Sequence, residues 1–260
     1  MKLLQDRVAL VTGAGRGIGR AIALAFAAEG AKLAITARTV SELDEVVVQI
    51  RSAGGTALAM PADLADQSLP SRLVADVEQS LGPVEILVNN AGIGSSADPR
   101  AVVDFSDEFW EQTLKVNLTA PYLLSKAVLP GMLARKWGRI IMIASINGKI
   151  GALHGAAYAA SKHGLLGFTR TLAMEVASQG ITVNAICPGP VHTVMNDRRV
   201  DYDAKRRGVA FDEQAAGLTP LGRRLEPEEI APLAVYLASS AAASVVGQAI
   251  NIDGGVLMTG

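Results

Sequence analysis

The sequence contains a single cysteine, Cys187, and only three histidines among 260 residues. One cysteine excludes an internal disulfide and any cysteine-rich metal site. The histidines His154, His163 and His192 show neither an HExxH motif nor the paired spacing of metal ligands. We therefore expect no metal centre.

Long hydrophobic runs and a large excess of one charge are also missing. No stretch reaches the ~18 consecutive apolar residues that a membrane-spanning helix needs. The beginning, MKLLQDRVALVTG, has one lysine before Asp6 and Arg7 interrupt the apolar run, which is not the pattern of a secretory signal. The formal net charge of −1 argues against nucleic-acid binding. We expect a cytoplasmic protein with neither a membrane nor a nucleic-acid partner.

Half of the sequence is hydrophobic, enough for a large core, and short apolar runs alternate with helical patterns such as 18–30 and 40–55. The apolar runs cover 7–12, 32–37, 56–63, 85–92, 138–145, 181–189 and 248–255. They are continuously apolar, which is typical of parallel strands buried on both faces. We predict a single doubly wound α/β domain over 1–260, with a mostly parallel seven-stranded sheet flanked by helices. Such sheets bind ligands at the carboxyl ends of their strands.

The first apolar run leads into TGAGRGIG (12–19), in which Gly13, Gly17 and Gly19 follow a G-x-x-x-G-x-G spacing. Glycines permit a tight turn and let backbone N–H groups approach a phosphate at the start of a helix. This spacing differs from the usual G-x-G-x-x-G fingerprint. The position between the first strand and the first helix favours nucleotide binding, with a purely structural turn as the alternative.

The second run ends at Ala37 and is followed by Arg38, with no carboxylate at its tip. Dinucleotide folds place an acidic residue there for the ribose 2′-hydroxyl of NAD, or an arginine for the 2′-phosphate of NADP. Arg16, inside the glycine turn, is expected to reach the same phosphate through its paired donors. The sequence therefore favours NADP(H), with NAD(H) as the alternative if both arginines are solvated surface residues.

A third pattern is YAASK, in which Tyr158 and Lys162 are separated by small residues. On a helix, positions i and i+4 share a face, with Cβ atoms about 5–6 Å apart. The phenol and the ammonium group can then converge on one point. An ordinary surface pair is the alternative.

Together, TGAGRGIG, NNAG (89–92), YAASK, PGPVHT (188–193) and NIDGG (251–255) make the chain resemble the short-chain dehydrogenases/reductases over nearly its whole length. Within that family, the run 158–189 is most similar to 3-oxoacyl thioester and polyketide ketoreductases. The resemblance implies a Rossmann-type oxidoreductase that interconverts a ketone and a secondary alcohol by hydride transfer. The alternatives are an NAD-dependent alcohol, sugar or steroid dehydrogenase of the same family and, in a different class, a non-catalytic cofactor-binding sensor.

The resemblance also implies a catalytic tetrad, whose matching positions are Asn117, Ser145, Tyr158 and Lys162. Tyr158 would exchange a proton with the substrate oxygen, and Ser145 would donate a hydrogen bond to that oxygen. The Lys162 cation is expected to lower the pKa of Tyr158 and to hold the nicotinamide ribose. Asn117 would hold a water molecule in a proton relay. An intact tetrad disfavours the sensor.

Further cofactor contacts follow from the same resemblance. Asp63 is expected to receive the adenine amino group, unless it only caps a turn or a helix. NNAG is expected both to line the adenosine side and to stabilise the sheet. The remaining contacts implied for the cofactor are Ile18, Asn90, Ala91, Gly92, Pro188, Gly189, Val191 and Thr193.

The segment 194–225 is polar, poorly periodic and rich in basic residues. By resemblance it is a substrate lid, which we expect to be the least ordered part of the chain without ligand. Its arginines and lysine are Arg198, Arg199, Lys205, Arg206, Arg207, Arg223 and Arg224, which could attract a phosphate on an acyl carrier; a solvated lid is the alternative. The family generally forms tetramers or dimers, so a homo-oligomer is expected.

Overall fold

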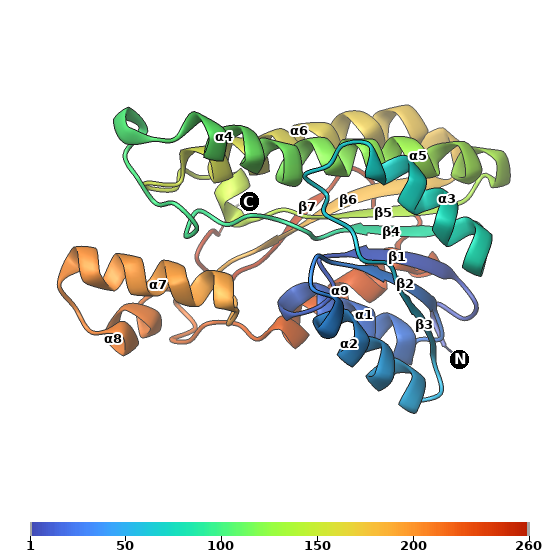
Figure 1. Cartoon of the computed structure of the whole chain (residues 1–260), viewed down its shortest axis with the longest axis horizontal. Coiled ribbons are helices and arrows are strands. Elements are labelled where there is room, and N and C mark those ends of the chain that lie inside the picture. The colour runs from blue at the N-terminus through green and yellow to red at the C-terminus, as the bar shows by residue number, and fades with distance from the viewer. Residues whose placement is uncertain (1, 259–260) are drawn as a thin grey trace.

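The computed structural model describes residues 2–258. Its centre is a seven-stranded sheet in the order β3-β2-β1-β4-β5-β6-β7, in which every pair of neighbouring strands is parallel (Figure 1). The strands are β1 (Val8–Thr12), β2 (Lys32–Thr36), β3 (Thr56–Ala59), β4 (Ile86–Asn89), β5 (Gly138–Ile143), β6 (Ile181–Pro188) and β7 (Ala249–Ile252). The predicted doubly wound fold is confirmed.

The strands lie where the apolar runs predicted them, and all seven are shorter than the predicted runs at one or both ends. The third run was predicted to extend to residue 63, but β3 ends at Ala59. Backbone pairing with β2 does not stop there, since Met60 N–H donates to Ile35 and Ala62 N–H donates to Ala37. Pro61 lies between them, and its missing N–H costs no bond to β2, because alternate residues face the same neighbour and β3 is the edge strand of the sheet.

Helices cover both faces of the sheet (Figure 1). On one face lie α1 (Gly17–Ala28), α2 (Val40–Ser52) and α9 (Pro227–Ala238). On the other lie α3 (Leu69–Leu81), α4 (Asp107–Leu114), α5 (Ala120–Arg135) and α6 (Ala156–Val176). A π-helical turn, Lys115–Thr119, joins α4 to α5. Short 3-10 turns occupy Val102–Asp104, Ile146–Gly148, Ala177–Gln179 and Ser240–Ala242. No helix within residues 2–258 is both long and apolar enough to cross a membrane.

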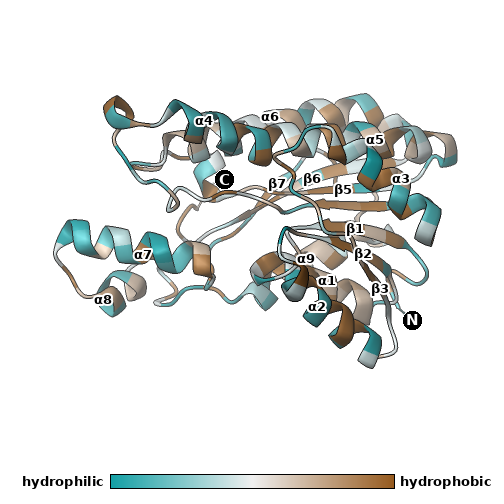
Figure 2. Cartoon of the chain, viewed as in Figure 1, coloured by the Kyte–Doolittle hydropathy of each residue, from teal (hydrophilic) through white to brown (hydrophobic). Residues whose placement is uncertain are grey.

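The core is split by the sheet into two hydrophobic layers. In β1, Ala9 and Val11 belong to the layer under α1, α2 and α9, whereas Val8 and Leu10 belong to the layer under α3, α5 and α6. Successive side chains of a strand point to opposite faces, so both sets must be apolar. This is why the strands read as unbroken apolar runs, and they appear brown in Figure 2.

The segment 194–225, which is polar and poorly periodic in sequence, contains α7 (Val194–Arg207) and α8 (Phe211–Ala216). In α7 the Thr193 hydroxyl accepts a hydrogen bond from Asn196 N–H, and Gly208 ends the helix in the left-handed region. Three basic residues in its last turn complement the helix dipole. The buried side chains of α7 are Val200 and Ala204, so its hydrophobic periodicity is weak. It projects beyond the carboxyl ends of the strands and is largely hydrophilic (Figures 1 and 2).

Candidate active site

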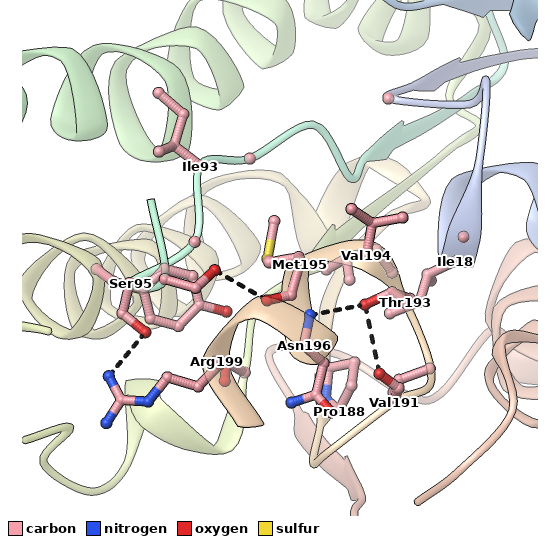
Figure 3. Close-up of a pocket in the computed structure, with 18 of the residues that line it drawn as sticks. Ile18, Ile93, Ser95, Pro188, Val191, Thr193, Val194, Met195, Asn196 and Arg199 are labelled. Carbon is pink, nitrogen blue, oxygen red and sulfur yellow. Dashed lines mark hydrogen bonds between the residues drawn. The ribbon is translucent and has the colours of Figure 1, made fainter. Parts of the chain in front are cut away.

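A cavity of about 930 Å³ lies at the carboxyl ends of the strands (Figure 3). Every residue predicted for the site lines it except Gly19 and Asn117. The structure thus brings together Gly13, Arg16, Gly17, Ile18, Arg38, Asp63, Asn90, Ala91, Gly92, Ser145, Tyr158, Lys162, Pro188, Gly189, Val191 and Thr193. These residues come from the carboxyl ends of six strands, β1 to β6, or the loops that follow them, from the first turn of α1 and from the first two turns of α6.

The glycine turn forms one wall of the cavity. Gly13 and Gly17 both have positive φ, and a Cβ atom at Gly13 would lie 2.8 Å from the Cα atom of Ala91. Within residues 2–258, no side chain caps the start of α1, and its first turn contains no acidic residue. The N–H groups at the start of α1 can therefore bind an anion in the part of the cavity beside the glycine turn. This geometry fits the pyrophosphate of a dinucleotide.

Gly19 has a different role from the one predicted, because it does not line the cavity. A Cβ atom at this position would lie 2.3 Å from the backbone oxygen of Gly13 and 2.3 Å from Nδ2 of Asn90. The third glycine of the motif therefore lets α1 pack against the turn that precedes it.

Thr12, which the sequence analysis did not single out, fixes the NNAG segment to β1. Its Oγ1 accepts hydrogen bonds from the N–H groups of Asn90 at 2.9 Å and Ala91 at 3.0 Å, and donates to Val88. In the opposite direction, Nδ2 of Asn90 donates hydrogen bonds to the carbonyl oxygens of Thr12 and Gly13. The NNAG segment thus stabilises the sheet while it lines the cavity.

The part of the cavity beside the glycine turn and the end of β2 carries several charged side chains. Arg38 is exposed at its rim, and Arg16 donates to Oε1 of Glu42 at 3.1 Å. Asp63 also lines the rim, and its Oδ1 accepts a hydrogen bond from Ala65 N–H, so it stabilises a turn as well. Glu42 was missed by the sequence analysis, which searched for a carboxylate at the tip of the second strand and not on the helix after it.

The opposite end holds Ser145, Tyr158 and Lys162. Ser145 follows β5, and its Oγ accepts a hydrogen bond from Asn147 N–H at 3.0 Å, which leaves the hydroxyl proton free to be donated. Tyr158 lies in the first turn of α6 and Lys162 one turn later, as the spacing predicted. Lys162 Nζ lies 5.7 Å from the centre of the Tyr158 ring and donates to the Ile143 carbonyl at 2.8 Å.

Burial shifts the pKa of both groups toward their neutral forms. The pKa of Lys162 falls to about 8 because its ammonium group is desolvated. Desolvation also raises the pKa of Tyr158, and the neighbouring Ser145 hydroxyl opposes that rise only in part. The expected lowering of the Tyr158 pKa by Lys162 is therefore wrong for the protein alone, in which the Lys162 ammonium is bound to Ile143.

Asn117 lies behind the cavity wall in the π-helical turn and is 1% exposed. Its Oδ1 accepts from Ile93 N–H at 2.7 Å, and its Nδ2 donates to the Ile93 carbonyl at 2.9 Å and to Ser161 Oγ at 3.1 Å. A Cβ atom at Gly92 would contact both Asn117 Oδ1 and Lys162 Nζ, so the amide is close to the lysine. Ile93 and Ser161 were not predicted as its partners.

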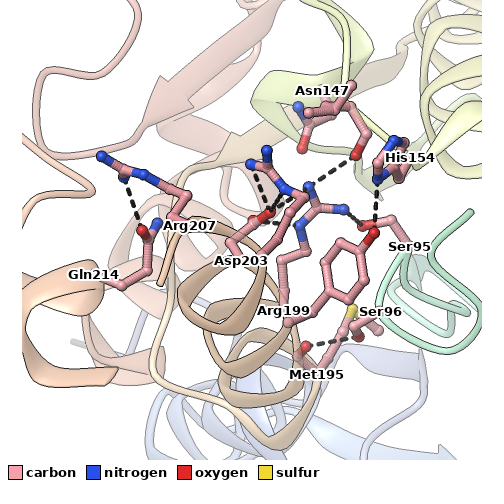
Figure 4. A network of polar contacts seen from close by, with 12 residues as sticks. Ser95, Ser96, Asn147, His154, Met195, Arg199, Asp203, Arg207 and Gln214 are labelled. Atoms are coloured by element: carbon pink, nitrogen blue, oxygen red, sulfur yellow. Dashed lines mark hydrogen bonds and ion pairs between the residues drawn. The ribbon is translucent and has the colours of Figure 1, made fainter. Parts of the chain in front are cut away.

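Helix α7 lines one side of the cavity (Figure 3). Met195 packs so tightly on Gly94 that a Cβ atom there would lie 2.5 Å from the methionine Cγ. Ser96 Oγ donates to the Met195 carbonyl at 2.8 Å. In the network of Figure 4, Arg199 binds Asp203 at 2.7 Å and the Leu153 carbonyl at 2.8 Å. A further contact joins His154 Nδ1 to the Tyr202 hydroxyl at 2.6 Å.

Comparison with known proteins identifies the family to which the chain belongs. The family model described as short chain dehydrogenase matches residues 7–203. The chain is 43% identical, over 96% of its length and 92% of the relative's, to the granaticin polyketide synthase putative ketoacyl reductase 1 of Streptomyces violaceoruber. It is 41% identical, over 98% and 99%, to a 3-oxoacyl-acyl-carrier-protein reductase of Pseudomonas aeruginosa. A solved actinorhodin polyketide ketoreductase variant with NADPH superposes with a TM-score of 0.91 at 40% identity, covering 96% of this chain and 97% of the other.

The cavity lies at the carboxyl ends of a doubly wound sheet, beside a glycine turn and the uncapped start of α1, and it also contains a tyrosine and a lysine from one face of α6. This combination is typical of a dinucleotide-dependent oxidoreductase. The chain belongs to the short-chain dehydrogenase family. It uses a nicotinamide cofactor and acts on CH–OH groups, interconverting a ketone and an alcohol.

Proposed function

We propose that this enzyme is an NADP(H)-dependent ketoreductase that reduces 3-oxoacyl thioesters or closely related ketones. The observation that carries the proposal is the single cavity that joins the uncapped start of α1 and two rim arginines to Ser145 and Tyr158. Similarity to ketoacyl and 3-oxoacyl reductases supports the substrate class.

The proton chemistry is assigned to three side chains. A nicotinamide cofactor, when bound, supplies the hydride. Tyr158 gives its phenolic proton to the carbonyl oxygen, and Ser145 donates a hydrogen bond to the same oxygen as negative charge develops there. The Lys162 ammonium, held by the Ile143 carbonyl, stabilises the phenolate that Tyr158 becomes. Asn117 positions the wall segment at Ile93, and its place beside Lys162 suits a water molecule that returns a proton.

A substitution at Tyr158 tests this assignment. Tyr158→Phe keeps the ring and removes the proton donor, so ketone reduction should fall by about 10²- to 10⁴-fold, the usual contribution of a positioned acid. Cofactor affinity, measured by fluorescence titration, should stay close to that of the wild type. Reduction by Tyr158→Phe at the wild-type rate on every accepted ketone would refute the mechanism.

The preference for NADP(H) is assigned to Arg38 and Arg16 at the adenosine rim. Guanidinium groups bind phosphate oxygens through paired donors. A solved neighbour at 41% identity, a putative gluconate 5-dehydrogenase of Beutenbergia cavernae, contains NADP, which supports the assignment. Parallel titrations with NADPH and NADH provide the test. Tighter NADH binding would reverse the assignment.

The segment 194–225 is proposed as the substrate lid. Five of its basic side chains pair with carboxylates, namely Arg199, Lys205, Arg206, Arg223 and Arg224. Arg207 binds Gln214 instead. Arg198 is exposed and lines the cavity, which makes it the best candidate for a carrier phosphate. Arg198→Ala should raise the KM for acyl thioesters and leave the KM for small ketones unchanged.

A second candidate function is oxidation of a hydroxy acid or alcohol with NAD. D-beta-hydroxybutyrate dehydrogenase of Cupriavidus necator, 36% identical over 97% of this chain and 98% of its own length, favours this alternative. Initial rates of 3-oxoacyl thioester reduction and of 3-hydroxy acid oxidation, measured in parallel, distinguish the two functions.

We further propose that the enzyme is a homo-oligomer, a tetramer or a dimer. Large apolar side chains are exposed on α4, α5 and α6, including Trp110, Tyr122 and Met174. These helices lie along one face of the sheet (Figure 1). Light scattering on the purified protein measures the mass, and a monomer at micromolar concentration would contradict the proposal.

A further inference from the structure

Glu42 occupies an unexpected place beside the glycine turn. It lies in the first turn of α2 and lines the same cavity as Arg16 and Arg38. A Cβ atom added at Gly15 would lie 2.8 Å from Glu42 Cβ and 2.9 Å from Glu42 Oε2. The glutamate side chain therefore lies flat on the turn, directly against the wall that fits a dinucleotide.

The partner of Glu42 is one of the two arginines assigned to the 2′-phosphate. Arg16 Nη1 donates to Glu42 Oε1 at 3.1 Å. The two side chains are 64% and 30% exposed, and ion pairs this exposed contribute little stability. Breaking the ion pair with Glu42 therefore costs little free energy, and Arg16 can bind a phosphate group instead. The Glu42 carboxylate nevertheless competes with that phosphate for Arg16.

Charge and hydrogen bonding act in opposite directions on the two cofactors. A carboxylate beside a phosphate dianion repels it, whereas a carboxylate accepts a hydrogen bond from a ribose hydroxyl. Many dinucleotide folds use an acidic residue for this hydroxyl at the tip of the second strand. Here Ala37 and Arg38 follow that strand, and Glu42 brings a carboxylate to the rim from the next helix.

We propose that Glu42 is a cofactor-selectivity residue, whose carboxylate competes with the 2′-phosphate of NADP(H) for Arg16 and accepts the 2′-hydroxyl of NAD(H). The inference rests on the proposed use of NADP(H) and deepens it. Glu42 weakens the preference that the two arginines create, so the enzyme keeps measurable affinity for both cofactors.

The test compares dissociation constants for NADPH and NADH, measured by cofactor fluorescence. Glu42→Gln should increase the ratio of NADPH to NADH affinity by about tenfold, because one charge near the phosphate is removed and the hydroxyl acceptor is weakened. Asp44→Asn and Glu45→Gln are matched controls, since both residues are exposed on the same helix and carry the same charge. The controls should change the ratio by less than about twofold because salt screens distant surface charges. An unchanged ratio in Glu42→Gln, or equal shifts in the controls, would overturn the inference.

A double-substitution cycle separates competition for Arg16 from simple repulsion. In the Arg16→Gln background there is no arginine to release, so Glu42→Gln should give a clearly smaller gain in NADPH affinity. An equal gain in both backgrounds would overturn the competition. Melting temperatures of all variants, measured without cofactor, show whether each one is folded.

Arg38→Gln distinguishes failure of this inference from failure of the proposed function. If Arg38→Gln weakens NADPH binding while Glu42→Gln changes nothing, the proposed function stands and Glu42 has no role in selectivity. If wild type binds NADPH no more tightly than NADH and Arg38→Gln has no effect, the proposed preference itself is wrong.

Discussion

The Asn117 side chain binds both backbone groups of Ile93, accepting from its N–H at 2.7 Å and donating to its carbonyl at 2.9 Å. The side-chain amide thus forms the two hydrogen bonds that the backbone of a neighbouring strand would form, and it holds the chain in place just after β4. Ile93 lines the cavity, so the amide determines the shape of a wall that it does not itself form. The π-helical turn Lys115–Thr119 supplies the backbone position from which the amide reaches Ile93.

Asn117→Ala removes these bonds and leaves two backbone groups of Ile93 unpaired. We expect a loss of about 2–3 kcal/mol in the free energy of unfolding, measured by urea denaturation. Cofactor binding should also weaken, since the segment after β4 loses its support. Ser161→Ala is the control, because it removes one of the Asn117 contacts and leaves Ile93 paired. A fully stable Asn117→Ala protein would show that water replaces the amide.

The packing role of Gly19 can be tested by comparing an alanine substitution there with one at Gly167. Gly19→Ala would place a methyl group 2.3 Å from the backbone oxygen of Gly13, which cannot move without displacing the turn. The melting temperature should fall, with a cost of about 1–3 kcal/mol or more from overpacking. Gly167→Ala, in α6, meets no other atom within 4 Å in the described part of the chain. It should be neutral or stabilising by up to about 1 kcal/mol through helix propensity. Equal effects of the two substitutions would contradict this packing role.

The strands and the cavity residues could be predicted because buried parallel strands are continuously apolar and because motifs mark their carboxyl ends. Helix α7 could not be predicted from periodicity, since its buried side chains are Val200 and Ala204. Its boundaries were nevertheless marked by Thr193 and Gly208, a capping residue and a left-handed glycine.

Contacts between residues far apart in the sequence could not be predicted from the sequence. Arg16 and Glu42 are 26 positions apart, and Asn117 lies 24 positions from Ile93. Their pairing depends on how α2 and the π-helical turn lie against the loops after β1 and β4. The raised pKa of Tyr158 is a similar case, because its main cause is desolvation by the surrounding protein.

Arg199 connects α7 to the opposite wall of the cavity through the Leu153 carbonyl, and its removal should loosen the proposed lid. Arg199→Ala loses the bonds to the Leu153 carbonyl and to Asp203. We expect the KM for ketone substrates to rise about tenfold, as for the loss of one charge-assisted hydrogen bond. Cleavage by chymotrypsin within 194–225 should also become faster.

Arg206→Ala is the matched control for the lid, because Arg206 binds the same Asp203 from the more exposed side. It should change neither the KM nor the rate of cleavage. If both variants were cleaved as slowly as the wild type, Arg199 would have no part in holding the lid.

The buried Lys162 ammonium makes stability depend on pH in a defined direction. The lysine has a pKa of 10.5 in the unfolded chain and about 8 in the folded protein, because burial disfavours the charged form. Below pH 8 both states carry the proton, and the folded state bears the full desolvation penalty. Between about pH 8 and 10.5 the folded protein releases the proton first, so this penalty on stability diminishes as pH rises. From the difference in pKa, the penalty removed is about 3 kcal/mol.

Lys162→Met abolishes this titration and should also abolish catalysis. Relative to the variant, the wild type should gain stability as pH rises from 8 to 10, by up to about 3 kcal/mol. The variant loses the hydrogen bond to the Ile143 carbonyl at every pH, a constant cost of about 1 kcal/mol that leaves the slope unchanged. Urea unfolding of both proteins at pH 7, 8, 9 and 10 measures the difference. Lys126→Met, on the exposed surface of α5, controls for the loss of one positive charge. If the free energies of unfolding of wild type and Lys162→Met differed by the same amount at every pH, the Lys162 ammonium would stay protonated from pH 7 to 10. Water in the cavity would then solvate it.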